Sequence, residues 1–170
     1  MLSKYAFPLA VCTLVSGGIA HADDATARTL CELKFAFDSS VLPTNAQQQL
    51  APIAARAAAR PSERIVLDGY ADPIGTAPYN TGLSIRRARA VRAQLVALGV
   101  NDASIVVTAF GEDGPRHADF ADDRRVGVWM TSTSMASIIA HTFESRGTAV
   151  KWEKPMTTAQ LEMSATVASR

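Results

Sequence analysis

The sequence predicts a two-layer α+β fold in which two main helices pack on one mixed sheet, with the element order βαβαββ. Two long stretches repeat apolar residues at three- and four-residue spacing, which is typical of helices. Glycine, proline and acidic residues separate these stretches from four short segments rich in apolar and β-branched residues. The four segments are predicted strands, at residues 33–37, 64–69, 104–110 and 125–129.

The first strand is followed by a helix and then by the second strand. Residues 33–37 alternate apolar with small or polar side chains and end at a turn over residues 38–40. Residues 45–60 are rich in Ala, Gln and Leu and predict a helix, which Pro61 ends. Because strand–helix–strand units usually pair their strands in parallel, we expect strands 33–37 and 64–69 to pair in this way.

The second helix has the clearest pattern in the chain. Its apolar or small residues recur at spacings of four, three, four and three, at Ser84, Ala88, Val91, Leu95 and Leu98. Gly99 follows at the position where a helix C-cap belongs. The strands at 104–110 and 125–129 then follow, separated by a loop at 111–123 that is rich in Gly, Pro and acidic residues.

The length and charge of the chain exclude several classes of protein. With 170 residues, the chain is long enough for one domain of ordinary size. It has 17 Lys and Arg residues against 16 Asp and Glu residues, so no excess of positive charge favours a polyphosphate partner. Aromatic residues make up 6%, too few for the stacking platforms of single-strand binders. We therefore expect no nucleic-acid partner.

The N-terminal segment has the pattern of a secretory signal peptide at residues 1–22. Lys4 precedes an apolar run at 5–20, which ends in the small-x-small motif Ala20-His21-Ala22. The run is shorter than the roughly 20 residues that a membrane-spanning helix needs. Cleavage after this motif leaves residues 23–32 as a short lead and sends the domain to the periplasm.

Two other interpretations of this segment stay open. The segment could remain uncleaved and anchor the domain at the inner membrane. Lipidation at Cys12 is a further option, although the preceding Val11 is bulkier than lipoprotein signals prefer. Cleavage would also remove Cys12, so Cys31 would have no partner in its own chain. Cys31 is then either a buried small hydrophobe or a site of intermolecular pairing, and its place before a strand favours burial.

Residues 131–170 differ in composition and are rich in Ser and Thr. We interpret them as a C-terminal appendage with one short amphipathic helix, whose apolar face would comprise Met135, Ile138, Ile139 and Phe143. Such a helix would be available for contacts with envelope proteins.

The most informative stretch runs from the end of the second strand, through Pro73 and Gly75, into the second helix. Ligands in α/β layers bind at the carboxyl ends of strands, where a helix N-terminus supplies unpaired N–H donors. Asp72 on the loop and Arg87 about one turn into the helix would face one crevice with opposite charges. This pair suits a zwitterion, because a carboxylate accepts from an ammonium and a guanidinium grips a carboxylate. Alternatively, Asp72 caps the loop and Arg87 only pairs with it.

Four blocks, at residues 69–75, 80–91, 111–112 and 123–126, together resemble the OmpA-like peptidoglycan-binding domain family. The resemblance covers residues 33–130. This family includes the C-terminal domains of OmpA-type porins, peptidoglycan-associated lipoproteins and flagellar stator subunits. It implies an OmpA-like fold and noncatalytic binding of the diaminopimelate of peptidoglycan stem peptides, in the periplasm at the outer membrane or cell wall.

The resemblance also implies roles for single residues. Asp72 would bind the ligand ammonium and Arg87 the ligand carboxylate. The other family positions shape or support the pocket or form its rim, and they fall on Asn80, Leu83, Arg125, Phe37 and Asp38. Tyr70 and Ala71 replace the more common His-Thr of the motif, which leaves the charged pair intact. Because only ten residues separate Ala22 from Leu33, we expect a stand-alone domain without a barrel or long linker.

Enzymatic and metal-binding interpretations have little support in the sequence. The candidate metal ligands are one histidine and three loop acids, at His117, Asp119, Asp122 and Asp123. They lack a second ligand helix, so we predict neither a metal site nor a cofactor. The chain has no G-x-S-x-G or cysteine–histidine signature, so we predict no catalysis. We interpret Asp122 and Arg124 as solvated charges, and Arg125 as structural or pocket-lining.

Two functions of different class remain. The first is a wall-binding module that tethers the envelope, or an envelope complex, to peptidoglycan. The second is an assembly subunit of an envelope or secretion machine, which would use the same fold together with residues 131–170. The presence of both Asp72 and Arg87 favours the first function.

Overall fold

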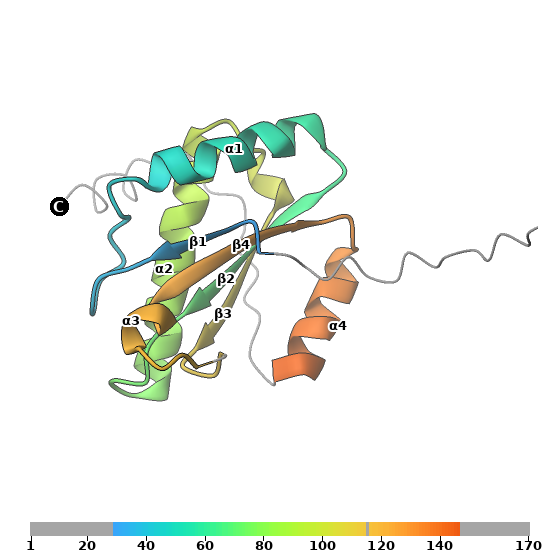
Figure 1. Ribbon diagram of the computed structural model, residues 1–170. Helices are drawn as coiled ribbons and strands as arrows, with labels where there is room; N and C mark the ends of the chain where they lie inside the picture. The colour runs from blue at the N-terminus through green and yellow to red at the C-terminus, as the bar shows by residue number, and fades with distance from the viewer. Residues whose placement is uncertain (1–28, 115, 147–170) are drawn as a thin grey trace, which may run out of the picture.

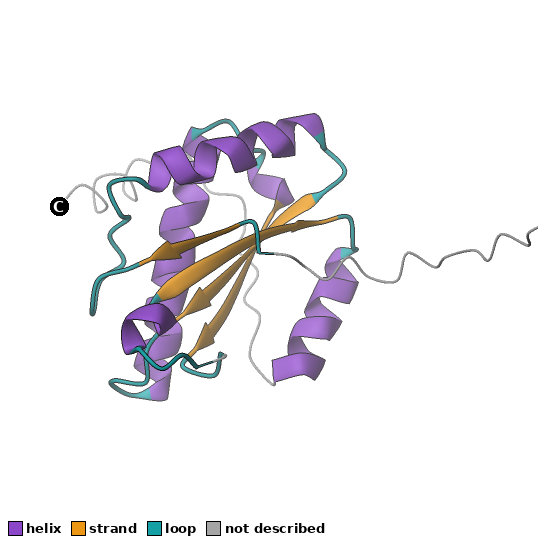
Figure 2. Ribbon diagram, viewed as in Figure 1, coloured by secondary structure: helices purple, strands orange, loops and turns teal. Residues whose placement is uncertain are grey.

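The computed structural model describes residues 29–114 and 116–146. Its four strands are β1 (Cys31–Lys34), β2 (Arg64–Tyr70), β3 (Ile105–Gly111) and β4 (Arg125–Thr131) (Figure 1). The helices are α1 (Ala46–Ala59), α2 (Ala77–Ala97), the 3-10 helix η1 (Asp102–Ser104), α3 (Phe120–Asp123) and α4 (Met135–Arg146) (Figure 2). The α+β prediction is therefore confirmed. The predicted signal peptide and residues 147–170 lie outside the described residues.

The sheet has the order β1-β4-β2-β3, so the last strand lies between the first two. β2 pairs with β3 in parallel, whereas β4 is antiparallel to both β1 and β2. The prediction that the first two strands pair directly was therefore wrong. The exposed side chains of Glu32 and Lys34 alternate with buried ones along β1, which suits a strand at the edge of a sheet. In β4, Val126 and Val128 are fully buried, which suits an inner strand.

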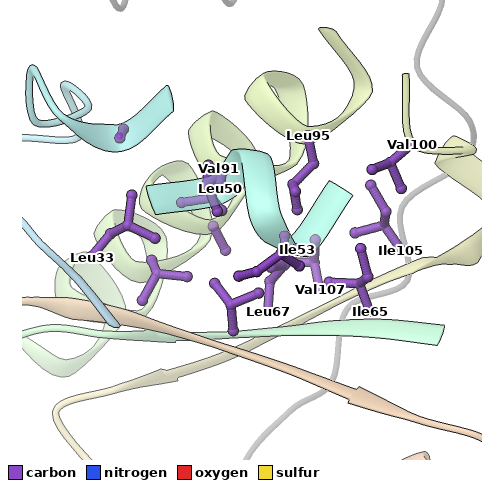
Figure 3. Close-up of a cluster of buried hydrophobic side chains, with 14 of the residues drawn as sticks. Leu33, Leu50, Ile53, Ile65, Leu67, Val91, Leu95, Val100, Ile105 and Val107 are labelled. Atoms are coloured by element: carbon purple, nitrogen blue, oxygen red, sulfur yellow. The ribbon is translucent and has the colours of Figure 1, made fainter. Parts of the chain in front are cut away.

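Helices α1 and α2 cover one face of the sheet and enclose the main core (Figure 3). Alternate residues of each strand point into this core, as the period of two requires. The sheet contributes Leu33, Ile65, Leu67, Ile105, Val107, Val126 and Val128, and the helices contribute Leu50, Ile53, Ala88, Val91 and Leu95. Each large apolar side chain buried in this way contributes about 1.5–3 kcal/mol.

Helix α2 begins at Ala77, seven residues before the first residue of the predicted periodicity. Thr76 is its N-cap residue and Pro78 lies in its first turn. The buried face of the helix includes polar residues such as Asn80 and Arg87, which an apolar pattern does not reveal. Arg87 therefore lies ten residues into the helix, nearly three turns at about 3.6 residues per turn, rather than one turn as expected.

Helix α4 lies on the opposite face of the sheet from α1 and α2 (Figure 1). Ile138 is buried against Val66 and Val106, with Met135 and Trp129 packed around them. The short helix predicted in this region is confirmed, and part of its apolar face is used inside the protein. Among the described residues, no helix is both long and apolar enough to cross a membrane.

Cys31 lies half-buried on β1, at the margin of the main core. Its Sγ lies 3.4 Å from Oε1 of Gln49, to which it donates a weak hydrogen bond. Burial, and then the charge of Glu32, raise the pKa of the thiol. A raised pKa leaves less of the reactive thiolate at neutral pH, which supports the interpretation of Cys31 as a packed small residue.

Gly69 provides a test of the close approach between β2 and α2. A Cβ added at Gly69 would lie 2.3 Å from the backbone oxygen of Ser84, so either the helix or the strand would have to move. We expect Gly69→Ala to lower the free energy of unfolding by about 3 kcal/mol or more in chemical denaturation. The control is Gly82→Ala on α2, where the added Cβ meets only the end of Arg86 at 3.4 Å. Equal stability of the two variants would contradict this close packing.

Candidate ligand-binding site

A cavity of about 200 Å³ lies where the turn after β1, the β2–α2 loop and the first turns of α2 meet. Four of the predicted site residues line it, namely Phe37, Asp38, Asp72 and Leu83. Three further lining residues were not predicted, namely Ile74, Gly75 and Tyr79. The start of α2 at Ala77 explains the omission of Tyr79, because the apolar periodicity places the helix start too late.

Asp72 presents a buried carboxylate to this cavity, with only 4% of the residue exposed. Its Oδ1 accepts a hydrogen bond from the backbone N–H of Ile74 at 3.3 Å, which closes a turn within the loop. Its Oδ2 accepts from Nη1 of Arg124 at 3.1 Å. The carboxylate is thus fixed by the loop on one side and by a guanidinium on the other.

Arg124 was predicted to be a solvated charge, and this prediction was wrong. Its side chain is largely buried and pairs with Asp72. Its Nε also donates to the backbone oxygen of Phe35 at 3.3 Å, so Arg124 joins the turn after β1 to the β2–α2 loop. Its neighbour Asp122 is exposed as expected and pairs with Lys34, whose hydrogen bond lowers the pKa of Asp122.

Arg87 lies directly behind the turn that follows β1 and has no exposed surface. Its guanidinium donates to three backbone oxygens, those of Ser39 at 2.8 Å, Tyr70 at 3.0 Å and Ala36 at 3.1 Å. Burial lowers the pKa of Arg87 to about 10, while the nearby Asp72 opposes this shift. The group therefore stays charged at neutral pH.

The two residues of the predicted charged pair, Asp72 and Arg87, lie near the same cavity but differ in their access to it. Asp72 lines the cavity, whereas Arg87 does not and is covered by residues 36–39. Asp72 caps the loop, as the alternative interpretation had it, but it takes its ion pair from Arg124 instead of Arg87. Two carboxylates, of Asp38 and Asp72, and two guanidinium groups, of Arg87 and Arg124, share the region, so their formal charges balance.

Asn80 supports the cavity from behind. It is fully buried on α2, and its Nδ2 donates to Oε2 of Glu112 at 2.6 Å. Its Oδ1 faces Gly75, where an added Cβ would approach to 3.3 Å. Gly75 has a φ of 117°, a conformation that favours glycine, so both space and backbone geometry call for glycine at this position.

Arg125 lies outside the cavity. Its guanidinium carbon lies 4.2 Å from the centroid of the Tyr70 ring, and its Nη1 donates to the backbone oxygen of Asp122 at 3.1 Å. It also pairs with Asp123 at 3.5 Å. Of the two roles considered for Arg125, structural or pocket-lining, these contacts favour the structural one.

The residues considered as metal ligands have other contacts. His117 Nδ1 lies 2.8 Å from Oδ1 of Asp123, and Asp119 accepts from the backbone N–H of Ala121 at the start of α3. Within residues 29–114 and 116–146, no group of three or more His, Cys, Asp or Glu residues is placed to hold a metal ion.

The sheet order, the helices and the loops around the cavity define a known class of protein. Residues 34–127 match the OmpA family, and the chain belongs to this family.

Relatives of known name agree with this assignment. The chain is 34% identical over 109 residues to the peptidoglycan-associated lipoprotein of Pseudomonas aeruginosa, a match that covers 61% of this chain and 64% of the relative. It is 40% identical over 81 residues to outer membrane protein A of Bordetella avium, covering 48% of this chain and 42% of the relative. The chain thus spans less than two thirds of each relative. A location in the periplasm, near the outer membrane or cell wall, agrees with these relatives.

Solved structures share the fold. The peptidoglycan-associated lipoprotein from Burkholderia pseudomallei superposes with a TM-score of 0.55 at 31% identity, covering 59% of this chain and 89% of that one. The C-terminal domain of Helicobacter pylori MotB gives a TM-score of 0.54 at 18% identity, covering 68% and 95%. This second likeness concerns the fold alone.

Arg87 is expected to contribute to the stability of the fold, whether or not a ligand is bound. Lysine at this position keeps the charge but cannot reach three separate carbonyl oxygens, so buried acceptors lose their donors. We expect Arg87→Lys to lower the free energy of unfolding by about 2 kcal/mol or more, measured by urea denaturation. The neighbouring exposed Arg86 is the control, and Arg86→Lys should change stability by less than about 0.5 kcal/mol. Similar losses in both variants would contradict the structural role of Arg87.

Proposed function

We propose that this protein binds peptidoglycan without catalysis, through the diaminopimelate of the stem peptide, and so tethers the envelope or an envelope complex to the cell wall. The observation that supports this proposal most directly is the buried carboxylate of Asp72 on the wall of a 200 Å³ cavity, with Arg87 and Arg124 beside it. The side-chain end of diaminopimelate carries one ammonium and one carboxylate, which are complementary to these groups.

The ammonium of the ligand would donate to Asp72. This carboxylate already accepts from Arg124 and from the N–H of Ile74, but its two oxygens have about four acceptor sites. The bond would be charge-assisted on both sides, which makes it short and strong. Because the carboxylates of Asp38 and Asp72 and the guanidinium groups of Arg87 and Arg124 balance one another, binding the ammonium alone would leave a positive charge, which the ligand carboxylate would offset.

The ligand carboxylate would bind Arg87. Its bonds to the backbone oxygens of Ser39, Tyr70 and Ala36 use three of the five N–H donors of the guanidinium. One N–H donor therefore remains on Nη1 and one on Nη2. Since residues 36–39 cover Arg87, this contact requires the turn to shift. The apolar side chains of Phe37, Ile74 and Leu83 would contact the methylene chain of the ligand, and Phe37 is 57% exposed for such a contact.

The second function, an envelope assembly subunit, has weaker support. That interpretation relied on an apolar helix face available to partners. Met135 and Ile138 of this helix pack against the sheet with Val66, Val106 and Trp129, so they are used within the domain. The geometry around Asp72 therefore favours the wall-binding function.

The first binding test removes the charge of Asp72 at constant shape. We expect Asp72→Asn to weaken binding to purified diaminopimelate-type sacculi at least ten-fold, because loss of one partner of a desolvated charge pair costs about 2–5 kcal/mol. Asp113→Asn is the control, since Asp113 is an exposed loop acid that does not line the cavity. Both variants should be shown to be folded by circular dichroism at the assay temperature. Retention of wild-type affinity in Asp72→Asn would refute the role of this carboxylate.

The second binding test exchanges the wall component. Stem peptides with lysine in place of diaminopimelate retain the ammonium and lack the carboxylate, so the arginines gain no anion. We expect such peptides to bind at least about ten-fold more weakly than diaminopimelate peptides. A buried donor without a partner costs about 1–3 kcal/mol of binding free energy, and a charged donor costs more. Calorimetric titration of both soluble peptides in one buffer measures the ratio. Equal affinities would show that no ligand carboxylate is recognised and would favour the assembly function.

A further inference from the structure

The turn between β1 and α1 has an unusual backbone conformation. Asp38 has a φ of 51°, and within the described residues it is the one non-glycine residue with a positive φ. Aspartate tolerates this left-handed conformation better than most residues, but the conformation persists only when surrounding contacts hold it. The turn's own backbone bond, from Ser39 N–H to the oxygen of Ala36, is long at 3.3 Å. Contacts from outside the turn are therefore important for its position.

The position of this turn affects the candidate site in two ways. The backbone oxygens of Ala36 and Ser39 accept from Arg87, so the turn covers the guanidinium. The side chains of Phe37 and Asp38 line the cavity. A shift of the turn would change both the shape of the cavity and the access to Arg87.

Tyr79 also lines the cavity and contacts the turn from α2. It lies in the first turn of α2 and is 45% exposed, and its hydroxyl donates a hydrogen bond to Oδ1 of Asp38. The guanidinium of Arg86 lies 5.5 Å from the centroid of the Tyr79 ring, which places a second contact on the same side chain. The hydrogen bond to Asp38 raises the pKa of Tyr79, so the phenol stays protonated and able to donate throughout the neutral range.

We infer that Tyr79 is a positioning residue for ligand binding, because its hydroxyl holds the turn of residues 36–39 against α2 in the place that shapes the cavity and covers Arg87. The inference rests on the proposed function for its ligand, since the turn matters to affinity only if the ligand binds in this cavity. Tyr79 acts through Asp38 and the turn, and no bond from its hydroxyl to the ligand is needed.

The test uses Tyr79→Phe, which removes the hydroxyl and keeps the ring. We expect the amide hydrogens of residues 38–41 to exchange several-fold faster in this variant without ligand, with the thermal midpoint unchanged. We also expect the affinity for a soluble diaminopimelate muropeptide to rise about three- to ten-fold, mainly through faster association, because the ligand carboxylate reaches Arg87 only when the turn shifts and the variant lacks one hydrogen bond that opposes this shift.

Two further variants make the test specific. Asp38→Asn keeps an acceptor oxygen and tolerates the same backbone conformation, so amide exchange at residues 38–41 should stay closer to that of wild type than it does in Tyr79→Phe. Phe120→Leu changes another exposed aromatic side chain, outside the cavity, and should affect neither exchange nor affinity.

Each outcome bears on the inference. Unchanged exchange in Tyr79→Phe would overturn it, and so would faster exchange at unchanged muropeptide affinity. If wild type itself fails to bind the muropeptide, the proposed function fails and the role of Tyr79 in ligand binding fails with it. The exchange measurement would still show whether the hydroxyl holds the turn.

Discussion

The candidate site depends on one buried guanidinium and the three backbone oxygens that receive its hydrogen bonds. Arg87 projects from the middle of α2 and contacts the turn after β1 through Ala36 and Ser39, and the end of β2 through Tyr70. A charged group without exposed surface is tolerated only when it is well bonded, so these three segments are held together as a condition of folding. The cavity lies where the same segments meet, and the side chain that organises it lies just behind its wall.

Other buried polar groups around the cavity follow the same rule. Asp72 pairs with Arg124, and Asn80 donates to Glu112. These pairs join the loop after β2 and the start of α2 to the segment between β3 and β4. Because polar networks lose much of their value when one member is unpaired, the loops are kept in register by bonds rather than by apolar contact. Bonds of this kind hold the carboxylate of Asp72 in place before a ligand arrives, which reduces the ordering cost of binding at this group.

The sequence allowed a good prediction of the elements and a partial prediction of the site. Strands and the second half of α2 were found because apolar periodicity reports burial, whereas the first turns of α2 were missed because Asn80 and other polar residues occupy their buried face. Asp72 was predicted from its place on the loop after the second strand, and Phe37 and Asp38 were predicted through motif resemblance. The role of Arg124 could not be predicted, since partner choice among adjacent charges depends on how the chain turns after α3. The central place of β4 depends on long-range pairing, which local patterns do not encode.

The sheet order also determines when the site can exist during folding. β1 pairs only with β4 in the described sheet, and their paired residues are more than ninety positions apart in the chain. Contacts at such separation form after the entropy of a long loop has been lost, so they come late in folding. The turn after β1, which forms one wall of the cavity, is therefore among the last parts to reach its place. A chain that stops before β4 would lack the strand that β1 pairs with, so an incomplete product would not form the complete candidate site.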